Sequence, residues 1–169
     1  MRSHFYLILG LACALIFSGR EAGGDPFGRD GNLEIWVRTN KPVYDFGEPI
    51  VVILKLKNAA SLPLIVNRRF DPFNDLQWEI FFDPAGFVPV RPAPPKPPGA
   101  DDYVVLKPGE SIEKEIPDLA EIVDGRLKKG LYGLRLTYIN KEKPKGPETW
   151  TGEIITNRLS FSIKSGNKT

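Results

Sequence analysis

The chain is poor in the two side chains most often used for chemistry near neutral pH. Its 169 residues include one histidine, His4, and one cysteine, Cys13. Both lie in residues 1–24, a segment that we expect the mature protein to lack. The remainder therefore cannot form a Ser-His-Asp triad, a disulfide, or a zinc or copper site of the usual nitrogen and sulfur type. These absences predict a protein that is not an enzyme and that needs no metal or other cofactor.

The N-terminal segment has the layout of a secretory signal peptide. Arg2 precedes the apolar run Phe5–Phe17, and small residues follow that run. The run has 13 residues, whereas a transmembrane helix needs about 20. We therefore expect residues 1–24 to be cleaved, leaving a secreted or periplasmic protein with no integral membrane span. Lipid anchoring through Cys13 is an alternative, which the apolar residues directly after Cys13 disfavour.

Neither sign of charge dominates the chain. The formal net charge is +2, and loss of Arg2, Arg20 and Glu21 with the signal peptide changes it by only one unit. A protein that binds nucleic acid is expected to carry a large basic excess gathered on one face. The composition therefore argues against nucleic acid as a partner.

Sequence patterns after the signal segment are those of β-strands. Residues 25–32 are rich in Gly, Asp and Pro and predict a flexible leader, and only residues 119–127 hint at helical spacing. Short stretches that are rich in β-branched and aromatic residues or alternate apolar and polar residues follow at intervals of about ten residues. These patterns predict an all-β fold over residues 33–164, an antiparallel immunoglobulin-like β-sandwich of seven to nine strands, and a disordered tail at 165–169. The candidate strands are 33–38, 50–58, 62–70, 76–82, 87–90, 130–140, 150–155 and 157–163, together with 102–107 and 111–116, which are either two short strands or one bent strand.

Residues 89–99, with the sequence PVRPAPPKPPG, form a proline-rich loop. Proline has no backbone N–H, so this segment cannot pair within a sheet and is expected to be extended. A stiff extended segment loses little entropy on binding, which makes the loop the feature best suited to contact a partner. The alternative is a rigid connection between sheets.

The expected partner-binding residues lie on this loop, on the loop 67–75, and at two tryptophans. Basic side chains suit an anionic surface, and exposed aromatic side chains anchor protein interfaces or sugars. For the tryptophans, packing in the core or at its rim is the competing interpretation. The residues are Arg68, Arg69, Phe73, Arg91, Pro94, Pro95, Lys96, Trp36 and Trp150.

Two groups of acidic residues have a chemical and a structural interpretation. Asp71, Asn74 and Asp75 are oxygen ligands of the kind that calcium binds, but three are too few, and the same residue types cap turns. Glu113 and Glu115 could form a catalytic pair, but their alternation with Ile112 and Ile116 is typical of a solvated strand face. We favour the turn and the solvated face.

Several turn motifs carry a resemblance to known families. Residues 39–48, TNKPVYDFGE, resemble the opening motif of macroglobulin-type immunoglobulin-like domains, with Phe46 in place of a proline. In that motif Tyr44 packs inward and Gly47 permits a turn. Residues 105–111 and 129–132 are similar to signatures of bacterial sandwich domains, and the latter resembles a tyrosine corner.

A second resemblance is to the bacterial intracellular proteinase inhibitor domain. The shared features are a strand ending at Asn58, the DPAG hairpin at 83–86, and the motifs at 106–111 and 130–132. This resemblance implies a sandwich fold and an inhibitory activity. An export signal is not a feature of that intracellular class.

The function expected from the sequence is that of an exported, non-catalytic binding domain. It would mediate protein-protein interaction in the cell envelope or outside the cell through residues 67–75 and 89–101. The partner is an unknown protein, either a protease or an envelope protein. The alternatives are a proteinase inhibitor that uses the proline-rich loop and a carbohydrate-binding module that depends on Trp36 or Trp150.

Overall fold

The computed structural model describes residues 31–143 and 149–165. The predictions for the signal peptide, most of the leader and nearly all of the C-terminal tail lie outside this range. Within it, the fold is all-β, with eleven strands and two short 3-10 turns, and no helix is long and apolar enough to cross a membrane. The elements are β1 (Leu33–Thr39), β2 (Val43–Asp45), β3 (Val52–Asn58), β4 (Leu64–Asn67), β5 (Leu76–Asp83), β6 (Gly86–Phe87), η1 (Ala100–Asp102), β7 (Tyr103–Leu106), β8 (Ser111–Ile116), η2 (Leu119–Glu121), β9 (Gly130–Asn140), β10 (Gly152–Ile155) and β11 (Leu159–Lys164).

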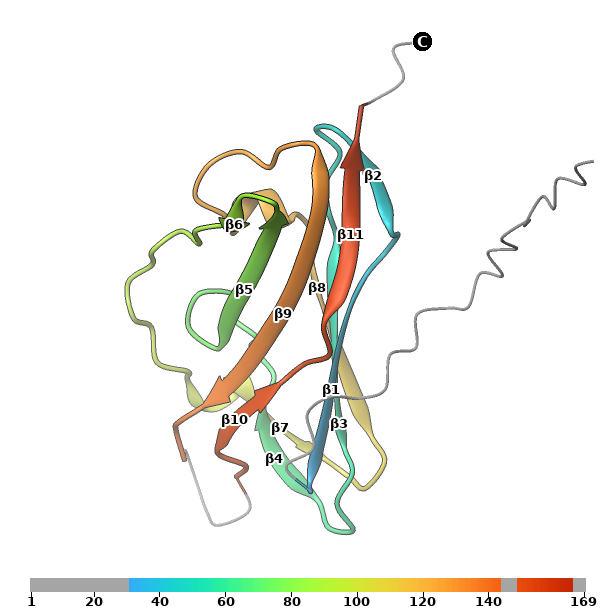
Figure 1. Ribbon diagram of the computed structural model, residues 1–169. Helices are drawn as coiled ribbons and strands as arrows, with labels where there is room; N and C mark the ends of the chain where they lie inside the picture. Colours follow the sequence, from blue (N-terminus) through green and yellow to red (C-terminus); the bar gives the residue numbers. More distant parts are fainter. Residues whose placement is uncertain (1–30, 144–148, 166–169) are drawn as a thin grey trace, which may run out of the picture.

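The strands form two larger sheets and one small one (Figure 1). One sheet has the order β1-β3-β8, and the other has the order β2-β11-β9-β5-β6, with β10 also paired to β9. Strands β4 and β7 pair only with each other. Residues far apart in the sequence thus meet in a single layered unit.

Alternating residues of the two larger sheets supply one hydrophobic core. Leu54 and Leu56 of β3 have no exposed surface, and neither do Leu134 and Leu136 of β9. Lys55 and Lys57, which alternate with Leu54, Leu56 and Asn58, point to the other face of the strand and are only partly buried. Burial of each such leucine contributes roughly 1.5–3 kcal/mol, so the core supplies most of the driving force for folding.

The structure corrects the predicted strand count and pairing. Val43–Asp45, which the sequence interpretation treated as part of a turn, forms β2 and pairs in parallel with β11. The described residues form eleven strands, so the predicted number of seven to nine is too low, and the β2–β11 pair departs from the predicted antiparallel pairing, which the other strand pairs follow. A strand of three residues carries too little periodicity to be recognised, and its partner lies almost at the other end of the chain. The all-β class is confirmed, whereas the immunoglobulin-like assignment stays a prediction.

Two motifs that carried the family resemblance have the expected local geometry. The hydroxyl of Tyr132 accepts a hydrogen bond from Lys128 N at 2.7 Å and donates one to Lys128 O at 2.8 Å, which is a tyrosine corner. Burial raises the pKa of Tyr132. Tyr44 is fully buried, and Gly47 has the positive φ of 86° that its turn requires.

A buried asparagine connects the two larger sheets at one edge. Asn157, which precedes β11, accepts a hydrogen bond from Val37 N at 2.8 Å and donates one to Val37 O at 3.0 Å. Its side chain therefore takes the place of a neighbouring strand beside β1. Local sequence patterns do not predict this contact, because the two residues are 120 positions apart.

Removal of this side-chain amide is expected to destabilise the domain. Asn157→Ala leaves both backbone groups of Val37 without their partner, so the free energy of unfolding should fall by roughly 1–3 kcal/mol. Asn157→Asp is the matched variant, because it keeps an acceptor for Val37 N and loses the donor to Val37 O. Urea unfolding measures both, and Arg158→Ala, at the exposed neighbouring residue, is the control. A change of less than about 0.5 kcal/mol in Asn157→Ala, the usual size for a surface substitution, would contradict the account.

Candidate functional site

The proline-rich loop is fixed to the domain at both ends. It contains no strand or helix over residues 91–99 and forms an arc to one side of β5 and β9 (Figure 1). At its start, Arg91 donates from its backbone N to Ile122 O at 2.9 Å and from Nε to Val123 O at 2.7 Å. At its end, Gly99 N donates to the carboxylate of Asp102 at 2.8 Å. The predicted absence of sheet pairing over 89–99 is confirmed for residues 91–99, whereas Val90 forms an isolated antiparallel bridge with Val123.

The middle of the loop is held through the backbone of Lys96. Proline has no N–H, so within the sequence PPKPP at residues 94–98 only Lys96 has a backbone donor. That N–H donates to Asn74 Oδ1 at 2.8 Å, and Lys96 O accepts from Arg69 Nη1 at 2.9 Å. Two side chains of the neighbouring loop thus satisfy both polar backbone groups of Lys96.

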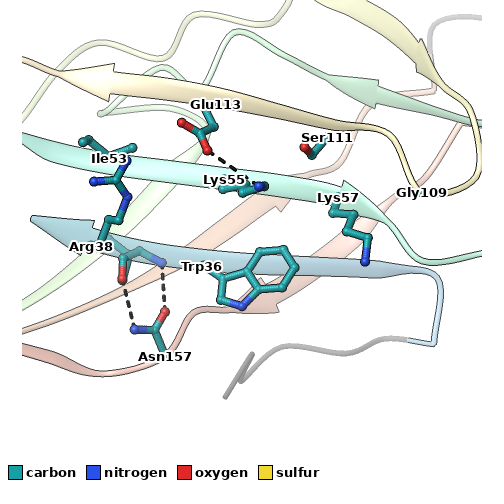
Figure 2. Close-up of a pocket in the computed structure, with 10 residues that line it drawn as sticks. Trp36, Arg38, Ile53, Lys55, Lys57, Gly109, Ser111, Glu113 and Asn157 are labelled. Atoms are coloured by element: carbon teal, nitrogen blue, oxygen red, sulfur yellow. Dashed lines mark hydrogen bonds and ion pairs between the residues drawn. The ribbon is translucent and has the colours of Figure 1, made fainter. Parts of the chain in front are cut away.

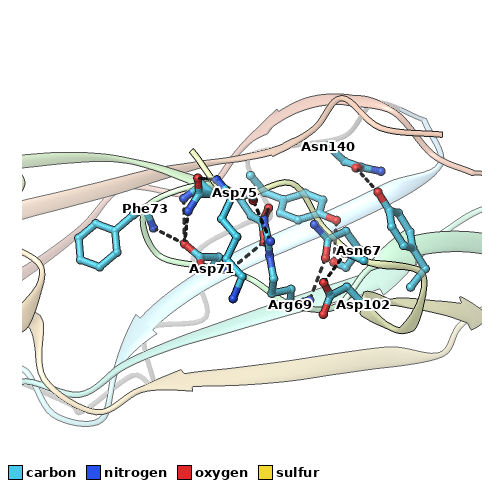
Figure 3. A network of polar contacts seen from close by, with 12 residues as sticks. Asn67, Arg69, Asp71, Phe73, Asp75, Asp102 and Asn140 are labelled. Atoms are coloured by element: carbon cyan, nitrogen blue, oxygen red, sulfur yellow. Dashed lines mark hydrogen bonds and ion pairs between the residues drawn. The ribbon is translucent and has the colours of Figure 1, made fainter. Parts of the chain in front are cut away.

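Arg69 is itself held by a bidentate ion pair with Asp75. Its Nε and Nη2 donate to the two carboxylate oxygens at 2.8 and 2.6 Å, and the side chains are only 12% and 4% exposed (Figure 3). The hydrogen bonds with Asp75 raise the pKa of Arg69. Asp75 also accepts from Asp71 N at 2.8 Å. A buried pair of this kind fixes the guanidinium, so that its Nη1 faces the loop.

The backbone between these groups adopts an uncommon conformation. Phe70 has a positive φ of 46°, although it is not a glycine, and its side chain is 1% exposed. Its ring packs against Tyr138 with a centroid separation of 5.3 Å. A left-handed residue costs of order 1–3 kcal/mol, which the packing and the ion pair offset. The resulting bend brings the Arg69 side chain and Asp71 N to the same carboxylate.

Asp71 and Asn74 form a capped turn that orients the second contact to the loop. Asp71 Oδ1 accepts from Phe73 N and Asn74 N, each at 3.0 Å, and from Asn74 Nδ2 at 2.9 Å. Partial burial acts to raise the pKa of Asp71, but these hydrogen bonds together lower it. The predicted turn-capping role is confirmed. Over the described ranges, no group of three or more His, Cys, Asp or Glu residues is arranged to hold a metal ion.

A shallow cavity of about 310 Å³ lies between the proline-rich loop and the end of β9. Pro95, Pro97 and Pro98 line one side, and Ile139 and Asn140 contribute to the other. Arg69 and Asp75 also contribute to the lining. We call the four residues Arg69, Asn74, Asp75 and Lys96, with the hydrogen bonds that join them, the loop clamp.

The structure brings some of the predicted partner-binding residues together. Arg69, Pro95 and Lys96 meet at the loop clamp, and Phe73 is 37% exposed on the adjoining turn. Pro94 is exposed on the loop. Arg68 is exposed and donates to Asp101 O at 3.3 Å, beyond the end of the loop. These residues therefore share one region of the surface.

Other predicted residues have different positions. Trp150 is 6% exposed and stacks on Tyr138 with a centroid separation of 5.5 Å, so the competing interpretation, packing in the core, describes its position. Trp36 is half-buried on β1, in the other large sheet, and is not part of the loop clamp. The guanidinium of Arg91 donates to Val123 O and Ala120 O, so this side chain anchors the loop.

Sequence reasoning did not identify Asn74 and Asp75 as supports of the loop. Both were noted only as turn or calcium-binding residues. The available signal was the single backbone donor of PPKPP, because a lone N–H in an ordered proline-rich segment needs an acceptor.

Comparisons of the chain with protein-family models and with curated proteins found no match.

The loop clamp predicts strong energetic coupling between Arg69 and Asp75. Asp75→Asn leaves a mostly buried guanidinium without its counter-charge and should lower the free energy of unfolding by about 3–5 kcal/mol. The double variant Arg69→Met, Asp75→Asn should lose much less than the sum of the two single losses. Urea unfolding of all four proteins measures this coupling. Additive losses would contradict a buried, cooperative pair.

Proposed function

We propose that this chain is an exported, non-catalytic binding domain that contacts another protein, in the cell envelope or outside the cell, through its proline-rich loop. The observation that carries the proposal is the satisfaction of both backbone groups of Lys96 by Arg69 and Asn74. Fixing a backbone residue costs about 1–2 kcal/mol. Because the free domain already fixes this loop, a partner need not order it on binding.

The exposed side of the loop has a definite chemical character. Pro94, Pro95 and Pro97 are exposed, and the Lys96 side chain is exposed among them. Phe73 adds an aromatic side chain on the turn that supports Lys96. This surface suits a partner with an apolar groove and an acidic group near the position of Lys96. The signal-like N-terminal sequence supports export.

Capture of the partner with matched variants tests the proposal. The purified protein is used as bait in an envelope extract, beside a variant in which residues 92–98 are replaced by Gly and Ser. Phe87→Ser is the control, because Phe87 is 75% exposed on β6, which belongs to the six-stranded sheet. The partner should be retained by the native protein and the control and lost by the loop variant. Equal retention by all three proteins would place binding elsewhere and contradict the proposal.

Inhibition of a protease is a second candidate function, favoured by the position of Lys96. The side chain of Lys96 is exposed on a loop held by Arg69 and Asn74, and a protease that cleaves after lysine binds a side chain of this kind. Pro97 follows, and a proline after the lysine makes that peptide bond a tertiary amide with restricted geometry. These features would favour binding over cleavage.

Assay against trypsin distinguishes this second candidate. If the loop binds in the protease cleft, the native protein should inhibit and remain uncleaved after Lys96, and Lys96→Ala should inhibit at least tenfold more weakly. Lys107→Ala, at another exposed lysine, should inhibit like the native protein. Absence of inhibition at micromolar concentration would reject this candidate for trypsin-like proteases.

A further inference from the structure

A second surface hollow lies on the outer face of the β1-β3-β8 sheet. It has a volume of about 540 Å³ and is open to solvent along one side of the sheet (Figure 2). The proline-rich loop contributes no residue to it. Six of the side chains that line it define what we call the outer groove: Trp36, Arg38, Lys55, Lys57, Ser111 and Glu113.

Strand register explains why these side chains meet. Trp36 of β1 lies opposite Lys55 of β3, and Lys55 lies opposite Glu113 of β8. An indole, an ammonium group and a carboxylate are therefore in one row across three strands. Arg38 lies two residues from Trp36 on the same face, about 7 Å along the strand.

The backbone of β1 is held in place at the residue next to Trp36. Each backbone group of Val37 bonds to the buried Asn157, as described above. Figure 2 shows the indole of Trp36 between the side chains of Arg38, also on β1, and Lys57 on β3, with Lys55 on β3 and Glu113 on β8. A half-buried indole on this strand offers a flat apolar surface to a ligand.

The charges of the outer groove are unequally compensated. Lys57 is 3.4 Å from Glu34, and Lys55 is 3.8 Å from Glu113, where both side chains are about half exposed. The second contact is long and well solvated, so it restrains neither group strongly. The side chain of Arg38 is exposed and makes no ion pair or hydrogen bond within the described part of the chain. A guanidinium two residues from the indole, on the same face of β1, is thus available for an anionic ligand.

We propose that the outer groove binds a hexuronic acid residue of an acidic saccharide. The apolar face of the sugar ring packs on Trp36, and its carboxylate pairs with the guanidinium of Arg38, a geometry that suits bidentate hydrogen bonding. Lys55, Glu113 and Ser111 supply donors and acceptors for the ring hydroxyls. This site is independent of the binding function proposed for the proline-rich loop.

Titration with a defined oligosaccharide tests the proposal. Tetragalacturonate is added to the purified protein, and binding is measured by calorimetry and by the change in tryptophan fluorescence. Trp36→Ala and Arg38→Gln should each weaken binding at least tenfold. The control Phe87→Ala should bind like the native protein. The fully methyl-esterified tetramer, which lacks the carboxylates, should bind at least tenfold more weakly than tetragalacturonate.

Three results would overturn the proposal. The first is equal binding of the esterified and free-acid tetramers, which would remove the role of Arg38. The second is unchanged binding by Trp36→Ala. The third is absence of binding by the native protein at millimolar tetragalacturonate. Urea unfolding of each variant shows that any loss of binding does not come from loss of the fold.

Discussion

The ion pair between Arg69 and Asp75 is the constraint on which the arrangement of the loops depends. It is mostly buried, so both groups must stay paired, and the pairing fixes the plane of the guanidinium. One remaining donor of that guanidinium then faces Lys96 O in the proline-rich loop. The side chain of Asn74, which is oriented by its hydrogen bond to Asp71, accepts a hydrogen bond from Lys96 N. A small number of polar contacts therefore orders a segment that cannot order itself by sheet pairing.

The two sheets provide the rigid support that this network needs. Asp75 directly precedes β5, and its backbone O accepts from Ile139 N of β9 at 2.8 Å. Tyr138, also on β9, packs against Phe70 and donates from its hydroxyl to Asn67 O at 2.7 Å. The strained turn is thereby tied to the longest strand of the fold, Gly130–Asn140. Sites supported in this way hold their geometry better than loops on their own.

Much of the fold could be predicted from local patterns. Alternation of apolar and polar residues predicted the strand at 33–38, the DPAG sequence marked the hairpin after β5, and the motif at 129–132 marked the tyrosine corner. Each of these signals is carried by neighbouring residues. Strand β2, the Asn157 contact and the clamp on Lys96 depend on pairs of segments that are distant in sequence. No periodicity within one segment encodes them, so sequence reasoning did not find them.

The same contrast applies to the candidate sites. Prolines and charges in the sequence indicated which loops are exposed, but burial decided which residues are available. Trp150 is buried and stacks on Tyr138 of β9, whereas Trp36 is half-buried on β1 and lines the outer groove. The domain thus has two chemically different surfaces, a proline-rich loop with one lysine and a groove with an indole and a guanidinium.

Hydrogen exchange at the Lys96 amide tests the central claim most directly, because this is the only backbone N–H in residues 94–98. The account predicts that Lys96 N–H exchanges far more slowly than in an unstructured peptide, and that Asn74→Ala removes this protection while amides of β9 stay protected. Exchange of Lys96 at the rate of an unstructured peptide in the native protein would contradict a loop held in place before binding.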